Sequence, residues 1–124
     1  MIVSIHQPAY LPWLGYFSRI KKSDIHIILD DVQFEKNSYI NRNKIWLNND
    51  WIWLTVPVLT KGKHKNLEIR NVEINNKLRW RKKHWGSICQ SYNKSKYFKN
   101  HKTFFDKIYS CEWHYIKDLC SDIN

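Results

Sequence analysis

The side chains best suited to chemistry gather near the start of the chain, in residues 6–17 (HQPAYLPWLGYF). His6 follows a short apolar run, and Gln7 and several aromatic residues stand beside it around two prolines. An imidazole has an unperturbed pKa of about 6.5, so His6 suits acid–base catalysis or a contact with phosphate. A histidine here could equally order its own loop through a hydrogen bond.

The elements that must position this segment form a β-loop-α-β unit over residues 2–31. Residues 2–5 are short, apolar and β-branched, which predicts a buried parallel strand, and residues 25–29 predict a second one. Between them, Pro12 fits a first helical position and apolar residues recur at helical spacing, so a helix that ends near Ser23 is predicted. We therefore expect an α/β fold with a Rossmann-like sheet, a β-hairpin insertion and a helical C-terminal part.

The arrangement around His6 indicates a pocket for a nucleotide or a sugar phosphate. Ligands of open α/β sheets bind outside the carboxyl ends of the strands, which is where this loop falls. Free N–H groups of the helix near Pro12 would favour an anion. The side chains expected to shape the pocket are Gln7, Tyr10, Trp13 and Tyr16.

Two carboxylates directly follow the second predicted strand. Asp30 or Asp31 could bind a sugar hydroxyl or a metal ion through oxygen, or could cap the following turn. We place both with His6 as the candidate catalytic group, and Gln33 extends the same edge as a substrate-binding residue. The three cysteines include no Cys-x-x-Cys pair and the histidines show no zinc-site spacing, so no zinc site is predicted and no residue is assigned as a metal ligand.

Residues 44–47 and 51–56 flank an Asn-Asn-Asp turn and predict a β-hairpin with aromatic faces. A basic cluster stands just before it and could clamp a diphosphate or form a solvated charged turn. This cluster consists of Arg42, Asn43 and Lys44.

The rest of the chain predicts a basic loop at 61–65, a strand at 67–74, and helices from residue 76 onward. Lys83 and His84 lie on a basic helix face that could bind phosphate or be merely solvated. Most of the seven tryptophans should be core, although those of the hairpin could line a groove suited to base stacking.

Composition excludes a disordered chain, because 43% of the residues are hydrophobic and 15% aromatic. No run is long enough for a membrane span and the N-terminus lacks a signal-peptide pattern, so we expect a cytoplasmic protein. The formal net charge of +10 favours anionic partners, including nucleic acid. However, the chain has 16 lysines and 5 arginines, whereas dedicated nucleic-acid readers concentrate arginine.

The same residues carry a family resemblance that covers essentially the whole chain. The chain resembles the WbqC-like family of bacterial proteins. The matching features are residues 6–17, Asp24, residues 29–34 (LDDVQF), 41–45 (NRNKI) and 53–58 (WLTVPV), Trp80 with Lys83 and His84, Tyr92, and residues 97–98.

The resemblance implies a cytoplasmic role in O-antigen, lipopolysaccharide or capsule biosynthesis, because such genes usually surround those of the family. No catalytic residue can be carried over from the family, and the resemblance does not identify a cofactor. Family members are about twice this long, so we expect residues 1–124 to be a single domain that forms the N-terminal portion of the family pattern. A truncated chain of this kind could be inactive, or could be complemented by another chain.

We therefore expect a transferase-type enzyme that acts on a nucleotide-activated or phosphorylated sugar. His6 would move a proton or hold phosphate, the carboxylates would bind hydroxyls, and Arg42 and Lys44 would hold the anionic part. Two alternatives remain open: a basic nucleic-acid-binding module, and a non-catalytic scaffold in polysaccharide assembly.

Overall fold

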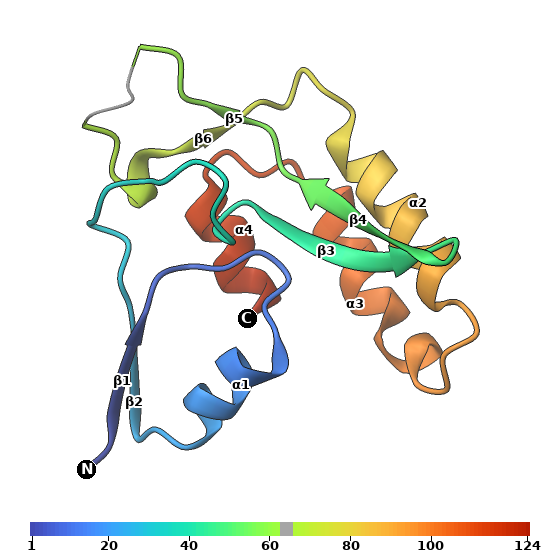
Figure 1. Ribbon diagram of the computed structural model, residues 1–124, viewed down its shortest axis with the longest axis horizontal. Coiled ribbons are helices and arrows are strands. Elements are labelled where there is room, and N and C mark those ends of the chain that lie inside the picture. Colours follow the sequence, from blue (N-terminus) through green and yellow to red (C-terminus); the bar gives the residue numbers. More distant parts are fainter. Residues whose placement is uncertain (63–65) are drawn as a thin grey trace.

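Figure 1 presents the computed structural model, which describes residues 1–62 and 66–124. Its elements, in chain order, are β1 (Val3–His6), α1 (Leu14–Lys21), β2 (Ile25–Ile28), β3 (Arg42–Leu47), β4 (Asp50–Thr55), β5 (Val58–Leu59), a single 3-10 turn (Ile69–Asn71), β6 (Glu73–Ile74), α2 (Trp80–Tyr92), α3 (Phe98–Ser110) and α4 (Ile116–Ile123).

The predicted β-loop-α-β unit is confirmed, since β1 and β2 pair in parallel and α1 connects them. The helix nevertheless begins at Leu14 and not at Pro12. Leu11 has a φ of 47° and Trp13 is extended, with φ −83° and ψ 168°, so helical geometry cannot start earlier. Pro12 lies before the cap, and its place at the first helical position was wrong.

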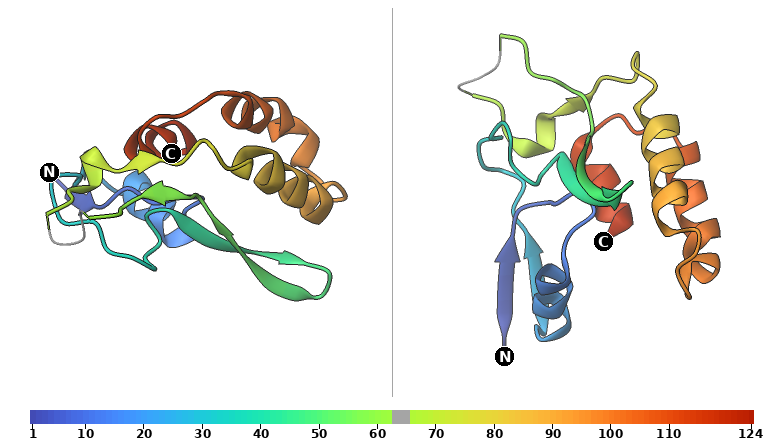
Figure 2. Two further views of the ribbon diagram at one scale, coloured as in Figure 1. Left: turned by 90° about the horizontal axis from the view of Figure 1, so that it is seen from above. Right: turned by 45° about the vertical axis from the view of Figure 1, so that its right-hand side comes forward.

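The α/β class is also confirmed. Within the described ranges the strands form three separate pairs: the parallel β1–β2 pair, and the antiparallel pairs β3–β4 and β5–β6. The Rossmann-like arrangement therefore stays a prediction. Figure 2 shows the β3–β4 hairpin on one side of the molecule and α2, α3 and α4 on the other.

The predicted hairpin is present and turns at Asn48 and Asn49, whose φ angles are 53° and 62°. Asparagine tolerates this left-handed conformation, which two-residue hairpin turns of type I′ require. The basic cluster was placed just before the hairpin, and that position was wrong. All three of its residues belong to β3, where Arg42 pairs with Thr55 and Lys44 with Trp53.

The strand expected at residues 67–74 is replaced by a 3-10 turn and the two-residue strand β6. Ile69 and Val72 are both fully buried although they stand three residues apart. A strand would have turned them to opposite faces, whereas one tight turn brings both inward. Residues 63–65 of the predicted basic loop lie outside the described part of the chain.

The core lies between the hairpin and the three C-terminal helices. Trp80, His84 and Ile88 form the buried side of α2, so His84 does not lie on an exposed basic face. The expectation that most tryptophans are core was wrong, because only Trp80 of the seven is buried. Trp85 and Trp113 are half-buried, and the exposed ones are Trp13, Trp46, Trp51 and Trp53.

Candidate functional site

The loop between β1 and α1 is fastened to the hairpin by backbone and amide hydrogen bonds. The N–H of Tyr10 donates to the carbonyl of Tyr39 at 3.0 Å. The amide of Asn43 donates to the carbonyl of Leu11 at 2.6 Å. This bond holds Leu11 in its left-handed conformation, so the structure gives Asn43 the task of ordering the loop.

Tyr10 and His84, both predicted to bind substrate, meet in the interior. The Tyr10 hydroxyl lies 2.8 Å from Nδ1 of His84 and 2.5 Å from the Tyr109 hydroxyl. Burial lowers the pKa of His84 to about 4, and a hydrogen bond with the backbone of Thr55 opposes that shift. Burial also raises the pKa of Tyr10 well above its usual range. His84 is therefore neutral at pH 7, and the three side chains tie the loop to α2 and α3.

His6 stands at the carboxyl end of β1, half-buried among aromatic rings. Its Nδ1 lies 2.7 Å from the carbonyl oxygen of Gln7. A carbonyl oxygen only accepts hydrogen bonds, so Nδ1 carries the proton and Nε2 is the basic nitrogen of the neutral ring. The rings of Trp13 and Tyr16 meet it edge-on, with centroids 5.6 and 5.0 Å away.

From His6 a continuous row of side-chain rings crosses the surface to the hairpin. We call it the aromatic strip: His6, Trp13, Tyr39 and Trp53. Successive centroids lie 5.6, 5.9 and 6.0 Å apart, within the range of favourable aromatic contacts. The last three rings are exposed. Segments far apart in sequence thus build one aromatic surface.

Two cations of the predicted basic cluster border the far end of the aromatic strip. The guanidinium carbon of Arg42 lies 3.9 Å and Nζ of Lys44 lies 4.8 Å from the centroid of Trp53. Both distances are typical of cation–π contacts. Alternation along β3 and β4 also places Trp46 and Trp51 on this outer face of the hairpin.

A cavity of about 590 Å³ adjoins the same end of the strip, and we call it the Trp53 cavity. Trp53 and Thr55 line one side, and the start of α2 lines the other with Arg79, Lys83 and His84. The first turn of α2 contains no acidic residue. Basic side chains at the positive end of a helix repel its dipole, and an anion in the cavity would relieve that repulsion. Lys83, which the sequence predicted as a phosphate contact, lines this cavity.

The acidic residues expected beside His6 follow the end of β2, where Ile28 pairs with His6. Asp30 and Asp31 follow β2, and the Asp30 carbonyl accepts a hydrogen bond from the N–H of Arg70 at 2.9 Å. No hydrogen bond or ion pair between described residues joins either carboxylate to His6. Gln33 donates to the carbonyl of Phe34 at 3.1 Å.

Two predicted binding residues, Tyr16 and Gln7, contact the His6 ring of the aromatic strip. Tyr16 is buried on α1, and its hydroxyl accepts a hydrogen bond from the amide of Asn124 at 3.2 Å. Gln7 is half-buried and fixes the His6 ring through its carbonyl. The sequence reading missed Tyr39 and did not single out Trp53 among the hairpin tryptophans. Alternation on a hairpin could have found Trp53, whereas nothing local marks Tyr39.

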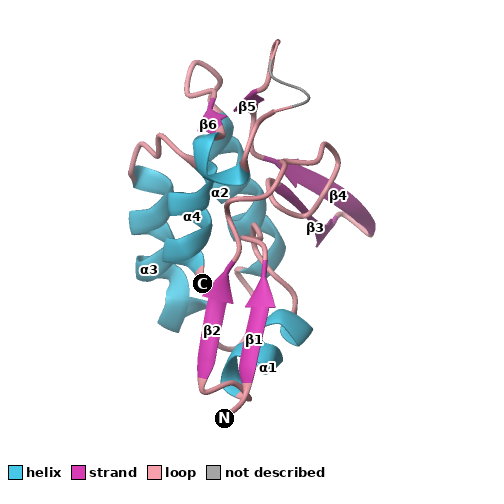
Figure 3. Ribbon diagram, turned by 90° about the vertical axis from the view of Figure 1, so that its left-hand side faces the viewer, coloured by secondary structure: helices cyan, strands magenta, loops and turns pink. Residues whose placement is uncertain are grey.

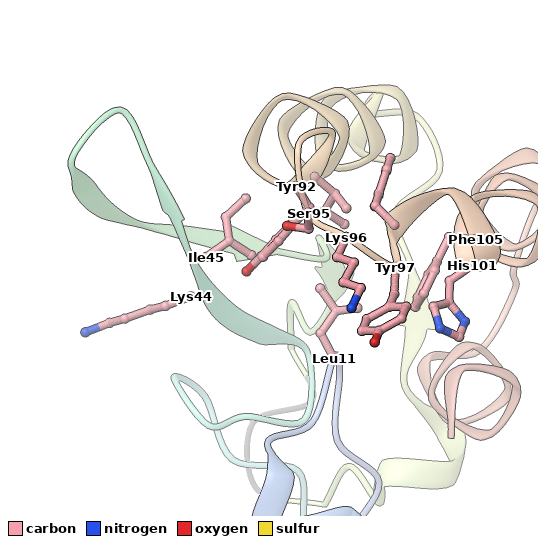
Figure 4. Close-up of a pocket in the computed structure, with 11 residues that line it drawn as sticks. Leu11, Lys44, Ile45, Tyr92, Ser95, Lys96, Tyr97, His101 and Phe105 are labelled. Atoms are coloured by element: carbon pink, nitrogen blue, oxygen red, sulfur yellow. The ribbon is translucent and has the colours of Figure 1, made fainter.

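A second cavity of about 420 Å³ lies on the opposite face of the hairpin, against α2, α3 and their connection. Figure 4 shows Lys96 and Tyr97 close to Leu11, whereas Lys44 points away from this space. Within the described ranges, no three His, Cys, Asp or Glu side chains gather as a metal site would require. The cysteines are free: Cys120 is buried, Cys89 half-buried and Cys111 exposed.

Fold and site together define an α/β protein with an exposed aromatic and basic surface around a half-buried histidine. The chain belongs to the WbqC-like protein family, whose model matches residues 7–123. It is similar to "Uncharacterized protein Rv1507c" of Mycobacterium tuberculosis, with 37% identity over 112 residues. That match covers 90% of this chain and 48% of the relative, so the chain spans about half the relative's length.

No solved structure matches the chain. None of the helices in the described ranges has the length and apolar character needed to cross a membrane.

Proposed function

We propose that this chain binds a nucleotide-activated or phosphorylated sugar, as the substrate-recognition part of a transferase in surface-polysaccharide biosynthesis. The observation that carries the proposal is the aromatic strip, which runs from His6 to Trp53 and ends at Arg42, Lys44 and the Trp53 cavity. Ring faces for stacking and cations for phosphate thus stand next to each other.

The strip suits a ligand in which a flat base or a sugar ring is joined to phosphate. Exposed indole and phenol rings stack on nucleobases, each at about 1–3 kcal/mol, and offer an apolar face to a sugar ring. Arg42 and Lys44 would hold one phosphate beside Trp53, and Arg79 and Lys83 would hold a second at the Trp53 cavity. The ligand's sugar would then extend toward Trp13 and His6.

His6 is the group on the strip that could act as a base. With Nδ1 bonded to the Gln7 carbonyl, Nε2 would take the proton of an acceptor hydroxyl as its oxygen bonds to the sugar carbon. The phosphate would leave with the electron pair of the broken bond. The cations near Trp53 would stabilise that departing charge.

The assignment to surface-polysaccharide biosynthesis is based on family membership and on the resemblance described above, since the mycobacterial relative is named only as uncharacterized. The chain spans about half of that relative. The transferase activity of a protein of the relative's full length is therefore itself proposed. The carboxylates Asp30 and Asp31 stay candidates for hydroxyl binding at the neighbouring strand end.

Calorimetric titration with UDP-glucose and glucose 1-phosphate tests the proposal. We expect Trp13→Ala and Trp53→Ala to weaken binding about tenfold or more, in line with the loss of one stacking contact. Trp51→Ala is the matched control, because this exposed tryptophan lies on the same hairpin outside the strip. Equal affinities in all three variants would contradict the assignment. So would unchanged binding and turnover in His6→Ala.

A nucleic-acid-binding module is the second candidate, and the outer face of the hairpin favours it. Trp46, Trp51 and Trp53 share that face with Arg42 and Lys44, a combination on which single strands stack. In that case Trp51→Ala would weaken binding as much as Trp53→Ala. The sugar proposal and this alternative therefore give opposite results for the control variant.

A further inference from the structure

The cavity on the face of the hairpin opposite the aromatic strip has an apolar floor and an aromatic wall. We call this space of about 420 Å³ the inner cavity. Figure 3 shows the hairpin on one side of the molecule and α2 and α3 on the other, and the cavity takes lining residues from all three. Ile45 of β3 and Ile88 of α2 are buried and form its floor. The aromatic side chains around it are Tyr92, Tyr97, Phe98 and Phe105.

The edge of the inner cavity is basic. Lys96 and His101 are exposed there, and none of the described lining residues is acidic. Nζ of Lys96 lies 5.1 Å from the centroid of Tyr97, and Figure 4 shows this amine beside Tyr97 and Leu11. Among the described residues, neither Lys96 nor His101 takes part in an ion pair. An anion at this edge would therefore meet positive charge and no competing carboxylate.

The loop that follows β1 contributes a strained residue to the inner cavity. Leu11 has a φ of 47°, a left-handed conformation that is unfavourable for a residue with a bulky side chain. The amide of Asn43 holds the Leu11 carbonyl at 2.6 Å, and the Leu11 side chain lines the cavity. Residues held in such conformations concentrate at ligand-binding sites. The fold thus maintains an unfavourable backbone at a residue that shapes this space.

We infer that the inner cavity binds a small apolar anion, in which a hydrocarbon body carries one carboxylate or phosphate group. Its volume lies in the range of roughly 300–1,000 Å³ that is typical of ligand pockets. An apolar cavity of about 150 Å³ holds benzene, so this one has room for a body roughly twice as large. The neutral polar side chains among the described lining residues are Ser95, Tyr92 and Tyr97. A nucleobase or a sugar needs more hydrogen-bond partners than these, whereas a hydrocarbon needs none.

Calorimetric titration of the chain with octanoate and with neutral 1-octanol tests the inference. We expect octanoate to bind more tightly, because only the anion uses the basic edge. Lys96→Gln should weaken octanoate binding about fivefold, the size of an exposed charge contact, and leave 1-octanol binding unchanged. Lys94→Gln is the matched control, because Lys94 is exposed on the same connection and does not line the cavity. Octyl phosphate, titrated in the same way, distinguishes a phosphate head group from a carboxylate.

A second substitution tests where the anion lies. Ser95→Trp should fill the inner cavity and abolish octanoate binding, whereas Ser121→Trp, at an exposed position of α4 outside the cavity, should bind as the wild type does. Octanoate that binds no more tightly than 1-octanol, or that binds equally to both tryptophan variants, would overturn the inference. So would a mass twice 15.2 kDa by light scattering that Ser95→Trp abolishes, because a second copy would then be the occupant. If thermal melts show that Ser95→Trp is unfolded, the comparison of Lys96→Gln with Lys94→Gln decides.

The inner cavity and the aromatic strip share none of their residues, so this result is separate from that of the UDP-glucose titration. Octanoate binding without UDP-glucose binding would leave the inner cavity assigned while the proposed function fails. UDP-glucose binding without octanoate binding would do the reverse.

Discussion

At the scale of single residues, rare side chains in one motif divide between two tasks. Tyr10 of that motif and His84 of α2 were both predicted to bind substrate, yet their side chains form hydrogen bonds inside the core. His6 and Trp13 come from the same loop and lie on the surface strip. Residue type and spacing indicate that a loop matters, but they do not distinguish the residues that anchor it from those that face a ligand.

The buried Tyr10 hydroxyl should be an important source of stability. Tyr10→Phe removes the partner of both His84 and Tyr109, and leaving such buried groups unsatisfied costs about 1–3 kcal/mol. We expect a decrease of that size in the free energy of unfolding, measured by urea titration. Tyr97→Phe serves as the control, because Tyr97 is exposed. A Tyr10→Phe variant as stable as the wild type would show that the hydrogen-bond chain contributes nothing.

The lowered pKa of His84 predicts that stability falls with acid. In the unfolded chain the imidazole titrates at about 6.5, whereas the folded value is about 4. Between these pH values the unfolded state binds more protons than the folded state, so the free energy of unfolding rises with pH. The stabilising contribution of neutral His84 is complete above pH 6.5 and is lost as the pH falls toward 4. The contribution is about 3 kcal/mol at most, at 1.36 kcal/mol per pKa unit.

Urea titrations at several pH values between 4 and 7 measure this dependence. His84→Gln should lose most of the slope whatever its absolute stability. His26 should add a smaller dependence of stability on pH in the same pH range, because burial also lowers its pKa. His26→Gln therefore serves as the comparison, and a full slope retained in His84→Gln would contradict the assignment.

At the scale of elements, sequence patterns that act within a few residues predicted the secondary structure correctly. An element whose backbone is decided by tertiary contacts was predicted wrongly. The parallel unit and the hairpin follow from apolar runs, prolines and an Asn-Asn turn, all of which act within a few residues. The stretch at 67–74 contains the right apolar residues for a strand, but their burial follows a tight turn packed against α4. Only tertiary contacts decide between those two backbones.

Gly15 offers a way to move one ring of the aromatic strip without weakening its helix. A Cβ at Gly15 would lie 3.0 Å from Nε1 of Trp13, so Gly15→Ala should push the indole aside. Alanine favours a helix over glycine by about 1 kcal/mol. We expect weaker UDP-glucose binding together with unchanged or higher thermal stability, as calorimetry and thermal melts would show.

Gly86→Ala is the matched control for this substitution. Gly86 lies inside α2 with nothing within 4 Å of the added Cβ, so stability should rise and binding should stay as in the wild type. Loss of binding in both variants, or in neither, would mean that the position of Trp13 does not determine affinity.

At the scale of the whole molecule, neither the aromatic strip nor the exposure of the aliphatic side chains of β1 and β2 could be predicted from sequence. The strip joins residues 6, 13, 39 and 53, and no periodicity connects these positions. The apolar runs at 2–5 and 25–29 predicted buried strands, and the expectation of burial was wrong for the face that carries Val3 and Ile5. Hydrophobicity shows that a face needs a cover, but it does not show where the cover comes from.

The net charge of +10 attracts every anionic ligand, so the salt dependence of binding should distinguish a nucleic acid from a nucleotide sugar. A single-stranded oligonucleotide held by Arg42, Lys44, Arg79 and Lys83 alone would make about four phosphate contacts. At a slope of about 0.7 per contact, its affinity should fall roughly 50-fold between 50 and 200 mM salt. UDP-glucose offers one diphosphate and gains the rest of its affinity from stacking, so its affinity should fall far less.

Fluorescence anisotropy with a labelled oligonucleotide and calorimetry with UDP-glucose, each at both salt concentrations, would measure the difference. Trp51→Ala should leave both ligands unaffected, because charge-driven binding of the oligonucleotide does not depend on that ring. An oligonucleotide that stays bound at 200 mM salt, and loses affinity in Trp51→Ala, would instead identify the outer hairpin face as a nucleic-acid surface. The +10 charge would then contribute to binding a single nucleic-acid strand, and the aromatic strip would be only the edge of that nucleic-acid surface.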